Sequence, residues 1–327
     1  MNRRSKPIRD RLFDQWGILN FQNWPSKIVE KLGEPPTGAS CSNREYSEPY
    51  PKNRLWPLIK WAFISYITDI YSTVAGENFE GKICFLDATA GPGISEIVAG
   101  DKSHYFFTSP MISLLTPTVG ITRVITQPKR KQPRPFYKIF LYDLDTDVVR
   151  YLKGTVREVA NKLTSMGFAP CTGGASWESC IVVSKEDANR VVREMLDNKS
   201  DNEKECLHWL VVLDPCGMEI DWSTIVKVVM NGKADLIFNY MHAAIRRQIP
   251  DACSKRNHRA DKFFPPGWRD VVCKSGEGVG EKAYEFYKGE LTRLDQSKEV
   301  IDVIIRGDER GMWQYRLLYV TKKSKEG

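Results

Sequence analysis

The stretch from Ile83 to Gly93, ICFLDATAGPG, combines residue types that could bind a charged, polar small molecule. An apolar run is followed at once by a carboxylate, Asp87, and then by small residues that include Ala90 and Gly91. Asp87 could accept hydrogen bonds from an ammonium group, and the glycines would let backbone N–H groups approach a ligand without obstruction by a Cβ atom. A plain turn from a strand to a helix is the alternative that this stretch leaves open.

Two common nucleotide-binding motifs are not expected at this turn. The G-x-G-x-x-G spacing would place a third glycine where this sequence has Glu96, and that carboxylate would meet the pyrophosphate of a dinucleotide. The sequence also contains no GxxxxGK[ST] motif, which disfavours a P-loop nucleotide hydrolase.

Polar residues follow four further apolar runs in the same way. These runs alternate with helical patterns, which is typical of a parallel sheet covered by helices on both faces. Ligands bind such sheets at the carboxyl ends of the strands, so we expect these side chains to form a rim there. The rim consists of Asp87, Asp143, Asp187, Asp214 and Asn239.

Asp143 is the candidate for binding a ribose, because a carboxylate at a strand end can take both hydroxyls by bidentate hydrogen bonding. Asp145 and Asp147 follow closely and could instead cap the amphipathic helix expected after them. The interval from Asp87 to Asp143 is 56 residues. A ribose-binding acid usually follows after roughly 20 residues, and a long insertion at about 98–136 accounts for the difference.

The whole pattern predicts an α/β fold, a Rossmann-like and mostly parallel sheet with helices on both faces and a C-terminal antiparallel hairpin. The hairpin is expected over 299–323, with its turn at 307–311. We expect residues 1–50 to form an N-terminal extension with short helices. Residues 51–327 are expected to form one domain with insertions at about 98–136 and 246–280, the first of them irregular around one short helix.

Five segments in their order resemble the three-Cys-motif partner protein family. That family carries an acid-x-x-Ala-Gly-Pro-Gly turn, a Ser-Pro helix start, an Asp-Pro-x-Gly strand end and an Asn after the next strand. The matching segments here are FLDATAGPG, SPMISLL, FLYDLD, VVLDPCGMEIDW and DLIFNYM, within roughly residues 54–246. The family is similar to class I S-adenosylmethionine-dependent methyltransferases, and its name refers to a genomic partner. The resemblance implies that fold, that activity and a protein partner from the same genomic system.

The resemblance also implies S-adenosylmethionine as the cofactor. Asp87 would accept hydrogen bonds from its ammonium group, and Asp143 would hold its ribose. Asp187 would bind the adenine amino group, with a helix N-cap as the alternative role. The cofactor-binding residues are then Asp87, Ala90, Gly91, Gly93, Asp143 and Asp187.

The strand end LDPCG resembles the Asp-Pro-Pro-Tyr type motif of amino-methyltransferases, in which an acid and a proline carbonyl hold the amino group of the acceptor. This implies Asp214 and Pro215 as acceptor-orienting groups, while Asn239 either lines the same cleft or caps the following helix. The second proline and the aromatic residue of that motif are missing here, so base methylation is not implied. Cys216 leaves open a Pro-Cys nucleophile, although cysteine is more often a small buried hydrophobe. A non-catalytic binding partner that keeps the fold is the alternative function.

Two basic segments suggest nucleic acid as a partner. Residues 123–138 hold six basic residues and no acidic one, and residues 246–274 hold eight basic residues against three acidic ones. Cations interleaved with Phe and Trp can follow a phosphate backbone and stack on bases. A solvated surface loop is the alternative for either segment, and the Pro-rich first one could be disordered.

The eight cysteines include no CxxC pair, which favours reduced, mostly buried thiols in a cytoplasmic protein over a disulfide framework or a zinc site. The four histidines show no paired spacing, and no metal site is expected. No run of 18 apolar residues and no secretory signal is present, so no membrane association is expected.

Overall fold

The computed structural model describes residues 24–36, 56–99, 102–126, 131–197, 205–274, 278–306 and 313–323. The chain divides into two compact units. The first holds residues 1–185 with 205–208, and the second holds residues 186–204 with 209–327. The boundary expected near residue 50 and the turn expected at 307–311 lie outside the described residues.

The predicted α/β fold with a mostly parallel sheet and a C-terminal antiparallel hairpin is confirmed. The seven strands of the sheet follow the order β5-β4-β1-β6-β7-β9-β8. Neighbours that are out of chain order require crossover connections, which helices supply.

The strands of the first unit are β1 (Ile83–Asp87), β4 (Lys138–Asp143) and β5 (Ile181–Lys185). All five residues of β1 are buried, as the continuous apolar run predicts for an interior parallel strand. β1 pairs in parallel with β4, and Asp87 stands opposite Leu141 in the register. Parallel pairing brings the carboxyl ends of both strands to one edge, where Asp87 and Asp143 are the last strand residues.

The first insertion is more regular than expected. A second antiparallel sheet, β2 (Ile94–Ala99) with β3 (Lys102–Phe107), follows the glycine turn directly. The helix after it, α5, extends over Ser109–Thr126 although it contains Pro117, so the expectation of one short helix was wrong. The other helices of this unit are α2 (Trp24–Leu32), α4 (Trp56–Asn78), α6 (Thr146–Ser165) and α7 (Trp177–Cys180).

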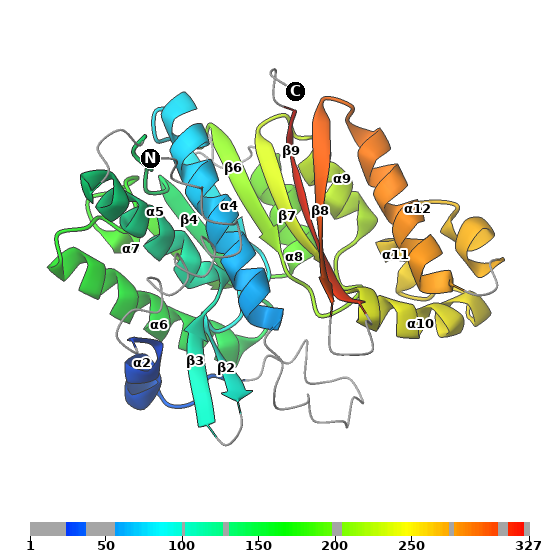
Figure 1. Ribbon diagram of the computed structural model, residues 1–327, viewed down its shortest axis with the longest axis horizontal. Coiled ribbons are helices and arrows are strands. Elements are labelled where there is room, and N and C mark those ends of the chain that lie inside the picture. The colour runs from blue at the N-terminus through cyan, green and yellow to red at the C-terminus, as the bar shows by residue number, and fades with distance from the viewer. Residues whose placement is uncertain are drawn as a thin grey trace, which may run out of the picture. The chain divides into compact units, whose positions relative to one another are not determined.

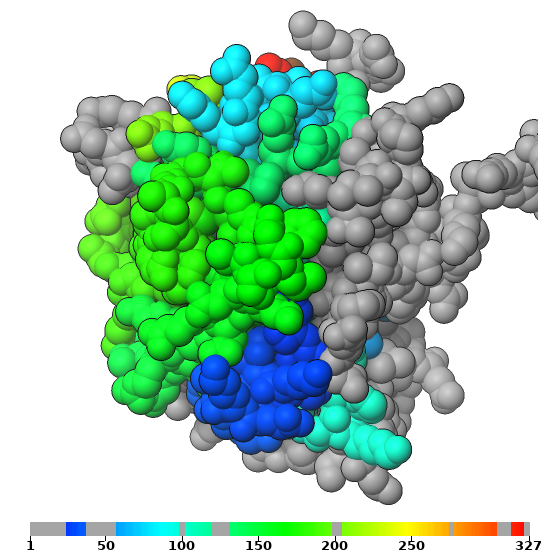
Figure 2. Space-filling view, turned by 90° about the vertical axis from the view of Figure 1, so that its left-hand side faces the viewer, coloured from blue at the N-terminus to red at the C-terminus, as the bar shows by residue number. Residues whose placement is uncertain are grey.

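The helix α2 lies against α6 and the β2–β3 hairpin (Figures 1 and 2). The Trp24 and Phe107 rings meet edge to face, with centroids 5.7 Å apart. The Lys31 ammonium lies 2.6 Å from the Glu158 carboxylate on α6. The Tyr151 hydroxyl donates to the Gly33 carbonyl at 2.9 Å. This part of the N-terminal extension is therefore a packed component of the first unit.

The second unit contains β6 (His208–Leu213), β7 (Ala234–Tyr240), β8 (Lys298–Arg306) and β9 (Trp313–Lys322). The first residue of β6, His208, still belongs to the first unit. β6 and β7 are parallel, whereas β9 is antiparallel to both β7 and β8 (Figure 1). Its helices are α8 (Ala188–Leu196), α9 (Trp222–Met230), α10 (His242–Ser254), α11 (Ala260–Phe263), the π-helix η2 (Arg269–Cys273) and α12 (Val279–Leu294).

The expectation of reduced thiols is wrong. Three disulfides join Cys84 to Cys206, Cys171 to Cys180 and Cys253 to Cys273, and Cys216 is disulfide-bonded as well. The spacing rules failed because pairing follows distance in the fold: Cys84 and Cys206 are 122 residues apart in sequence and 5.7 Å apart between Cα atoms. Such bonds persist in oxidising compartments and in the cytosol of hyperthermophiles, so an ordinary reducing cytoplasm is disfavoured.

Within the described ranges, none of the helices has the length and apolar character needed to cross a membrane.

Candidate functional site

The turn that follows β1 is shaped by the carboxylate of Asp87. This side chain is fully buried, and its Oδ1 accepts hydrogen bonds from the Thr89 backbone N–H at 3.1 Å and from the Thr89 hydroxyl at 3.4 Å. The backbone N–H of Ala90 then donates to the Tyr142 carbonyl on β4 at 2.9 Å. Asp87 therefore directs the chain out of β1 and across the end of β4.

The two glycines of the turn differ in their surroundings. Gly91 has a φ of +63°, and a Cβ atom built there would meet nothing within 4 Å. Gly93 has a φ of +82°, and a Cβ atom there would lie 3.1 Å from Leu152 and 3.3 Å from both Met111 and Thr155. Open space for a ligand therefore lies beside Gly91, whereas Gly93 is needed for packing inside the protein.

Asp143 lies at the carboxyl end of β4 and faces this turn. Its Oδ2 accepts a hydrogen bond from the Gly91 N–H at 3.0 Å, and its Oδ1 accepts one from the Asp145 N–H at 2.9 Å. Burial raises the pKa of Asp143 above its ordinary value, and the hydrogen bonds from these two N–H groups act in the opposite direction. A carboxylate offers about four acceptor positions, so Asp143 can accept from further donors such as ribose hydroxyls.

The alternative role of capping belongs to Asp145, whose Oδ1 accepts from the N–H groups of Asp147 and Val148 at the start of α6. Asp187 caps α8 in the same way, accepting the Arg190 N–H at 2.9 Å. Asp187 belongs to the second unit, whereas the glycine turn and Asp143 belong to the first. The helix N-cap, which was the alternative role predicted for Asp187, is therefore present.

In the second unit, the expected catalytic residues Asp214 and Asn239 lie in direct contact. The Asn239 Nδ2 donates to the Asp214 Oδ1 at 2.6 Å. Asn239 is buried inside β7, and α10 begins only at His242 with no capping side chain, so Asn239 does not cap that helix. Because a carboxylate only accepts, the amide nitrogen must face Asp214, and the orientation of the carboxylate is set by this bond.

The residues next to Asp214 rule out one hypothesis. Pro215 is buried directly after the strand. Cys216 is disulfide-bonded, so its sulfur is not a thiol that could attack a substrate. The Pro-Cys nucleophile was therefore wrong, and the strand end offers a carboxylate as its reactive group.

A partly buried charge network near β7 was missed by the sequence reasoning. The Arg316 guanidinium donates to Asp302 and to Glu281 at 3.0 Å each, and it lies 3.6 Å from the centre of the Tyr284 ring. The other Glu281 oxygen is 3.1 Å from Nε2 of His242. Burial, with a smaller contribution from nearby arginines, lowers the pKa of His242 to about 4. The available signal was a lone arginine inside the apolar strand run QYRLLYV.

The basic segment 246–274 is less available to nucleic acid than its sequence suggests. Its aromatic residues Phe263, Phe264 and Trp268 are buried, so they cannot stack on bases. Four of its eight cations form ion pairs within the protein: Lys255 with Asp251, Arg259 with Asp221, Arg269 with Asp261, and Lys274 with Asp270. The first basic segment, 123–138, lies partly outside the described residues, and its Phe136 is buried.

No group of three or more His, Cys, Asp or Glu side chains within the described residues is arranged to hold a metal ion.

No protein-family model matches the chain, and no curated protein matches it either. Among solved structures, Trm1 from Pyrococcus horikoshii with S-adenosyl-L-methionine is similar at 14% identity and a TM-score of 0.37. That match covers 81% of this chain and 56% of the other, so this chain spans little more than half of it.

Two further structures cover most of both chains. Protein LPL1258 from Legionella pneumophila matches at 11% identity and a TM-score of 0.43, over 84% of this chain and 87% of the other. An O-methyltransferase from Bacillus cereus in complex with SAH matches at 8% identity and a TM-score of 0.39, over 94% and 99%. Likenesses at this level carry no conclusion about activity, which must come from the residues of the chain itself.

Proposed function

We propose that this chain is an S-adenosylmethionine-dependent methyltransferase. The proposal depends chiefly on the Asp143 carboxylate, which ends β4 beside the glycine turn and is hydrogen-bonded to the Gly91 N–H at 3.0 Å. A ribose-binding acid and a turn with open space beside it are the two parts that such a cofactor needs at the carboxyl edge of a parallel sheet. The bound cofactor would supply a methyl group activated on a sulfonium.

In this proposal the residues assigned to the cofactor, all of them in the first unit except Asp187, bind and orient it. Asp143 accepts hydrogen bonds from the ribose hydroxyls through the positions that Gly91 and Asp145 leave open. The backbone of the turn approaches the methionyl part at Gly91, where no Cβ atom intervenes. Asp87 holds the turn in shape and accepts from the ammonium group, and Asp187 binds the adenine amino group.

The residues of the second unit act on the methyl acceptor. The Asp214 carboxylate accepts a hydrogen bond from the acceptor and takes its proton, and the Pro215 carbonyl orients the same group. Asn239 keeps Asp214 in one orientation through the 2.6 Å hydrogen bond. A single positioned acid or base of this kind typically contributes about 10²–10⁴-fold to the rate.

The finer assignments have separate grounds. The clustered cations of segments 123–138 and 246–274 suggest a nucleic-acid acceptor, and the resemblance to the three-Cys-motif partner family implies a protein partner from the same genomic system. A cytoplasmic location was suggested by the absence of CxxC pairs. The disulfides make that location most consistent with a hyperthermophilic cytoplasm. Because Phe263, Phe264 and Trp268 are buried, contact by 246–274 would depend on its cations and not on stacking.

A non-catalytic binding partner with the same fold is the second candidate function. The observation that favours it is the strand end at Asp214, where the residue that stacks on the acceptor in the Asp-Pro-Pro-Tyr motif is absent and Cys216 is disulfide-bonded.

Calorimetry with S-adenosylmethionine and S-adenosylhomocysteine tests the cofactor assignment. The expected result is a binding heat for both ligands that is lost in Asp143→Ala and kept in Asp214→Ala. Transfer of a deuterated methyl group into total nucleic-acid and protein fractions, read by mass spectrometry, then separates the two functions. Binding without transfer into any fraction would support the non-catalytic partner, and no heat for either ligand would contradict the proposal.

The nucleic-acid contact has its own test in salt dependence. Phosphate binding by clustered cations releases counterions, so affinity should fall steeply between about 50 and 200 mM salt. An affinity that stays constant over this range would point to a protein or a small molecule as the partner.

A further inference from the structure

The loop that follows Asp214 is held by one arginine from a distant segment. The Arg259 Nε donates to the Met218 carbonyl at 2.8 Å, and its Nη2 donates to the Glu219 carbonyl. Its Nη1 lies 2.8 Å from the Asp221 Oδ1. All three guanidinium nitrogens are thus directed at three residues of this loop, Met218, Glu219 and Asp221, a fork of donors that only arginine provides.

A second side chain holds the same loop from the other end. Asn189, which is buried at the start of α8, donates from Nδ2 to the Glu219 carbonyl at 2.9 Å. Its Oδ1 accepts the Asp221 N–H at 2.7 Å and the Thr224 hydroxyl at 2.9 Å. Met218 and Ile220 are fully buried between these contacts. These contacts hold the loop from Met218 to the start of α9.

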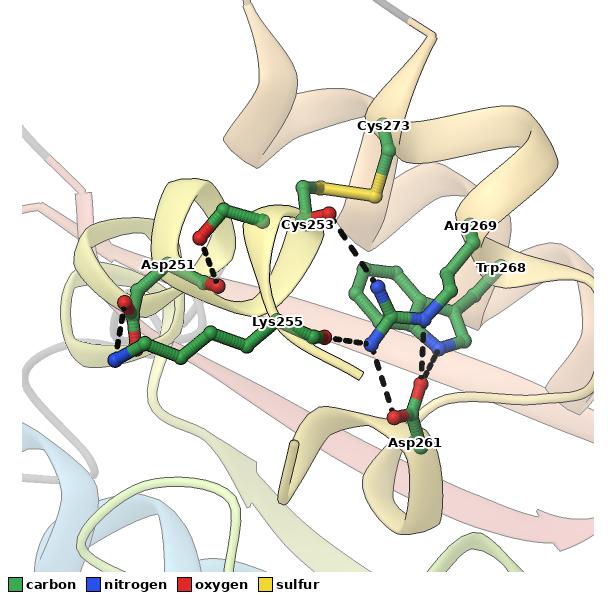
Figure 3. Close-up of a disulfide and its surroundings, with 8 residues drawn as sticks. Asp251, Cys253, Lys255, Asp261, Trp268, Arg269 and Cys273 are labelled. Carbon is green, nitrogen blue, oxygen red and sulfur yellow. Dashed lines mark hydrogen bonds and ion pairs between the residues drawn. A yellow bond between two sulfur atoms is a disulfide. The ribbon is translucent and has the colours of Figure 1, made fainter. Parts of the chain in front are cut away.

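The segment that carries Arg259 is itself closed into a rigid unit (Figure 3). The Cys253–Cys273 disulfide joins the end of α10 to the end of η2. Arg269 forms a bidentate pair with Asp261, at 2.8 and 2.9 Å, and also donates to the Lys255 carbonyl at 2.7 Å. Figure 3 shows the disulfide, the Arg269–Asp261 pair and the hydrogen bond from Arg269 to Lys255, which follows α10 directly.

We propose that Arg259 is a positioning residue of the methyl-acceptor site, acting through residues 218–221 to fix the backbone on which Asp214 stands. The inference rests on the proposed function, because Asp214 is assigned there to the acceptor. It changes the role that the sequence suggested for Arg259, namely one of several cations tracking a phosphate backbone. Its charge is paired with Asp221, and its donors are used inside the protein.

The disulfide has a defined part in this arrangement. It keeps the segment between Cys253 and Cys273 closed, so that Arg259 reaches the loop from a fixed base. Reduction of this bond, or a Cys253→Ser/Cys273→Ser double variant, should loosen the contact of Arg259 and mimic its loss in part.

The test compares Arg259→Gln and Arg259→Lys with Arg256→Gln, a matched control that removes an exposed cation three residues away. Hydrogen–deuterium exchange of the amides of residues 216–224 reports on the loop directly. Loss of the contacts of a charged donor should speed their exchange about tenfold or more in both Arg259 variants and leave Arg256→Gln like the wild type. Unchanged exchange in Arg259→Gln would overturn the inference.

Methyl transfer provides the functional readout, with the nucleic-acid and protein fractions of a total cell extract as acceptors. Arg259→Gln should lower transfer about 100-fold, the cost of misplacing a reacting group by about 1 Å. Its affinity for S-adenosylhomocysteine and its melting temperature should stay near the wild-type values, and free guanidinium ion should restore part of the activity in Arg259→Ala. A wild-type rate in Arg259→Gln would refute the positioning role.

The outcomes separate this inference from the proposed function. If the wild type neither binds S-adenosylhomocysteine nor transfers methyl groups, the proposed function fails, and the positioning role fails with it. If the wild type does both and Arg259→Gln differs from it in neither exchange nor transfer, only the positioning role fails. If Arg256→Gln and Arg259→Gln both lose transfer while neither changes the exchange of residues 216–224, the two arginines act as substrate-binding cations, and the positioning role is again wrong.

Discussion

Replacing the two glycines of the turn after β1 should separate cofactor binding from folding. Gly91→Asn places a side chain in open space, because nothing lies within 4 Å of its Cβ position. Asn tolerates the left-handed conformation that the φ of +63° requires, so the loss of stability should be about 1 kcal/mol. The same side chain would stand where the cofactor is proposed to meet the backbone, beside the carboxylate of Asp143.

Gly93→Leu should instead reduce the stability of the fold more than it affects cofactor binding directly. The φ of +82° costs any such residue about 1–2 kcal/mol. The new Cβ atom would lie 3.1–3.3 Å from Leu152, Met111 and Thr155, and overpacking of this kind costs about 1–3 kcal/mol. The expected loss is therefore about 2–5 kcal/mol, most of it in folding. The sequence predicted Gly93 as a cofactor-binding residue, but protein atoms of Leu152, Met111 and Thr155 surround its Cβ position.

Urea denaturation measures the free energy of unfolding of each variant, and calorimetry with S-adenosylhomocysteine measures its affinity for the ligand. We expect Gly91→Asn to weaken binding about 100-fold or more, equivalent to roughly 2.7 kcal/mol, while it remains folded. A Gly91→Ala variant is a control with a smaller side chain and a larger backbone strain, and it should bind with an intermediate affinity. If Gly91→Asn binds the ligand as the wild type does, the turn is only structural and the cofactor assignment is refuted.

Two further predictions concern stability. The pKa of His242 is lowered from 6.5 to about 4, so the folded state takes up a proton less readily than the unfolded chain. The contribution of His242 to the free energy of unfolding is therefore fully present above about pH 6.5, and up to about 3 kcal/mol of it should be lost as the pH drops towards 4. Urea denaturation at several pH values measures this loss. A His242→Gln variant that keeps the full pH dependence would contradict the assignment. The Cys84–Cys206 bond spans 122 residues, and the Cys171–Cys180 bond spans 9. Loop entropy predicts that replacing each pair by Ala costs about 5 and about 3 kcal/mol respectively, and equal losses in thermal denaturation would refute this explanation.

Local sequence alone determined the strands of the main sheet and the strand ends that carry polar residues, but not the β2–β3 sheet or the length of α5. Continuous apolar runs gave buried parallel strands, because a strand covered on both faces has no polar side to alternate with. Asp87 and Asp143 follow from this, since each is the last residue of such a run. The C-terminal hairpin was equally predictable from its two long β-rich runs.

Tertiary structure alone decided which of those residues meet. The hydrogen bonds from Gly91 to Asp143 and from Asn239 to Asp214 join residues 52 and 25 positions apart, and their distances depend on strand pairing that no local pattern contains. The cysteines are a sharper case, because their pairing is a property of the folded distances and not of their spacing. Arg259 shows the physical reason most directly. Its place in a basic run predicts a surface charge, because the sequence does not show which acceptors lie near it. Only the folded loop at Met218 supplies the carbonyl groups that its guanidinium binds.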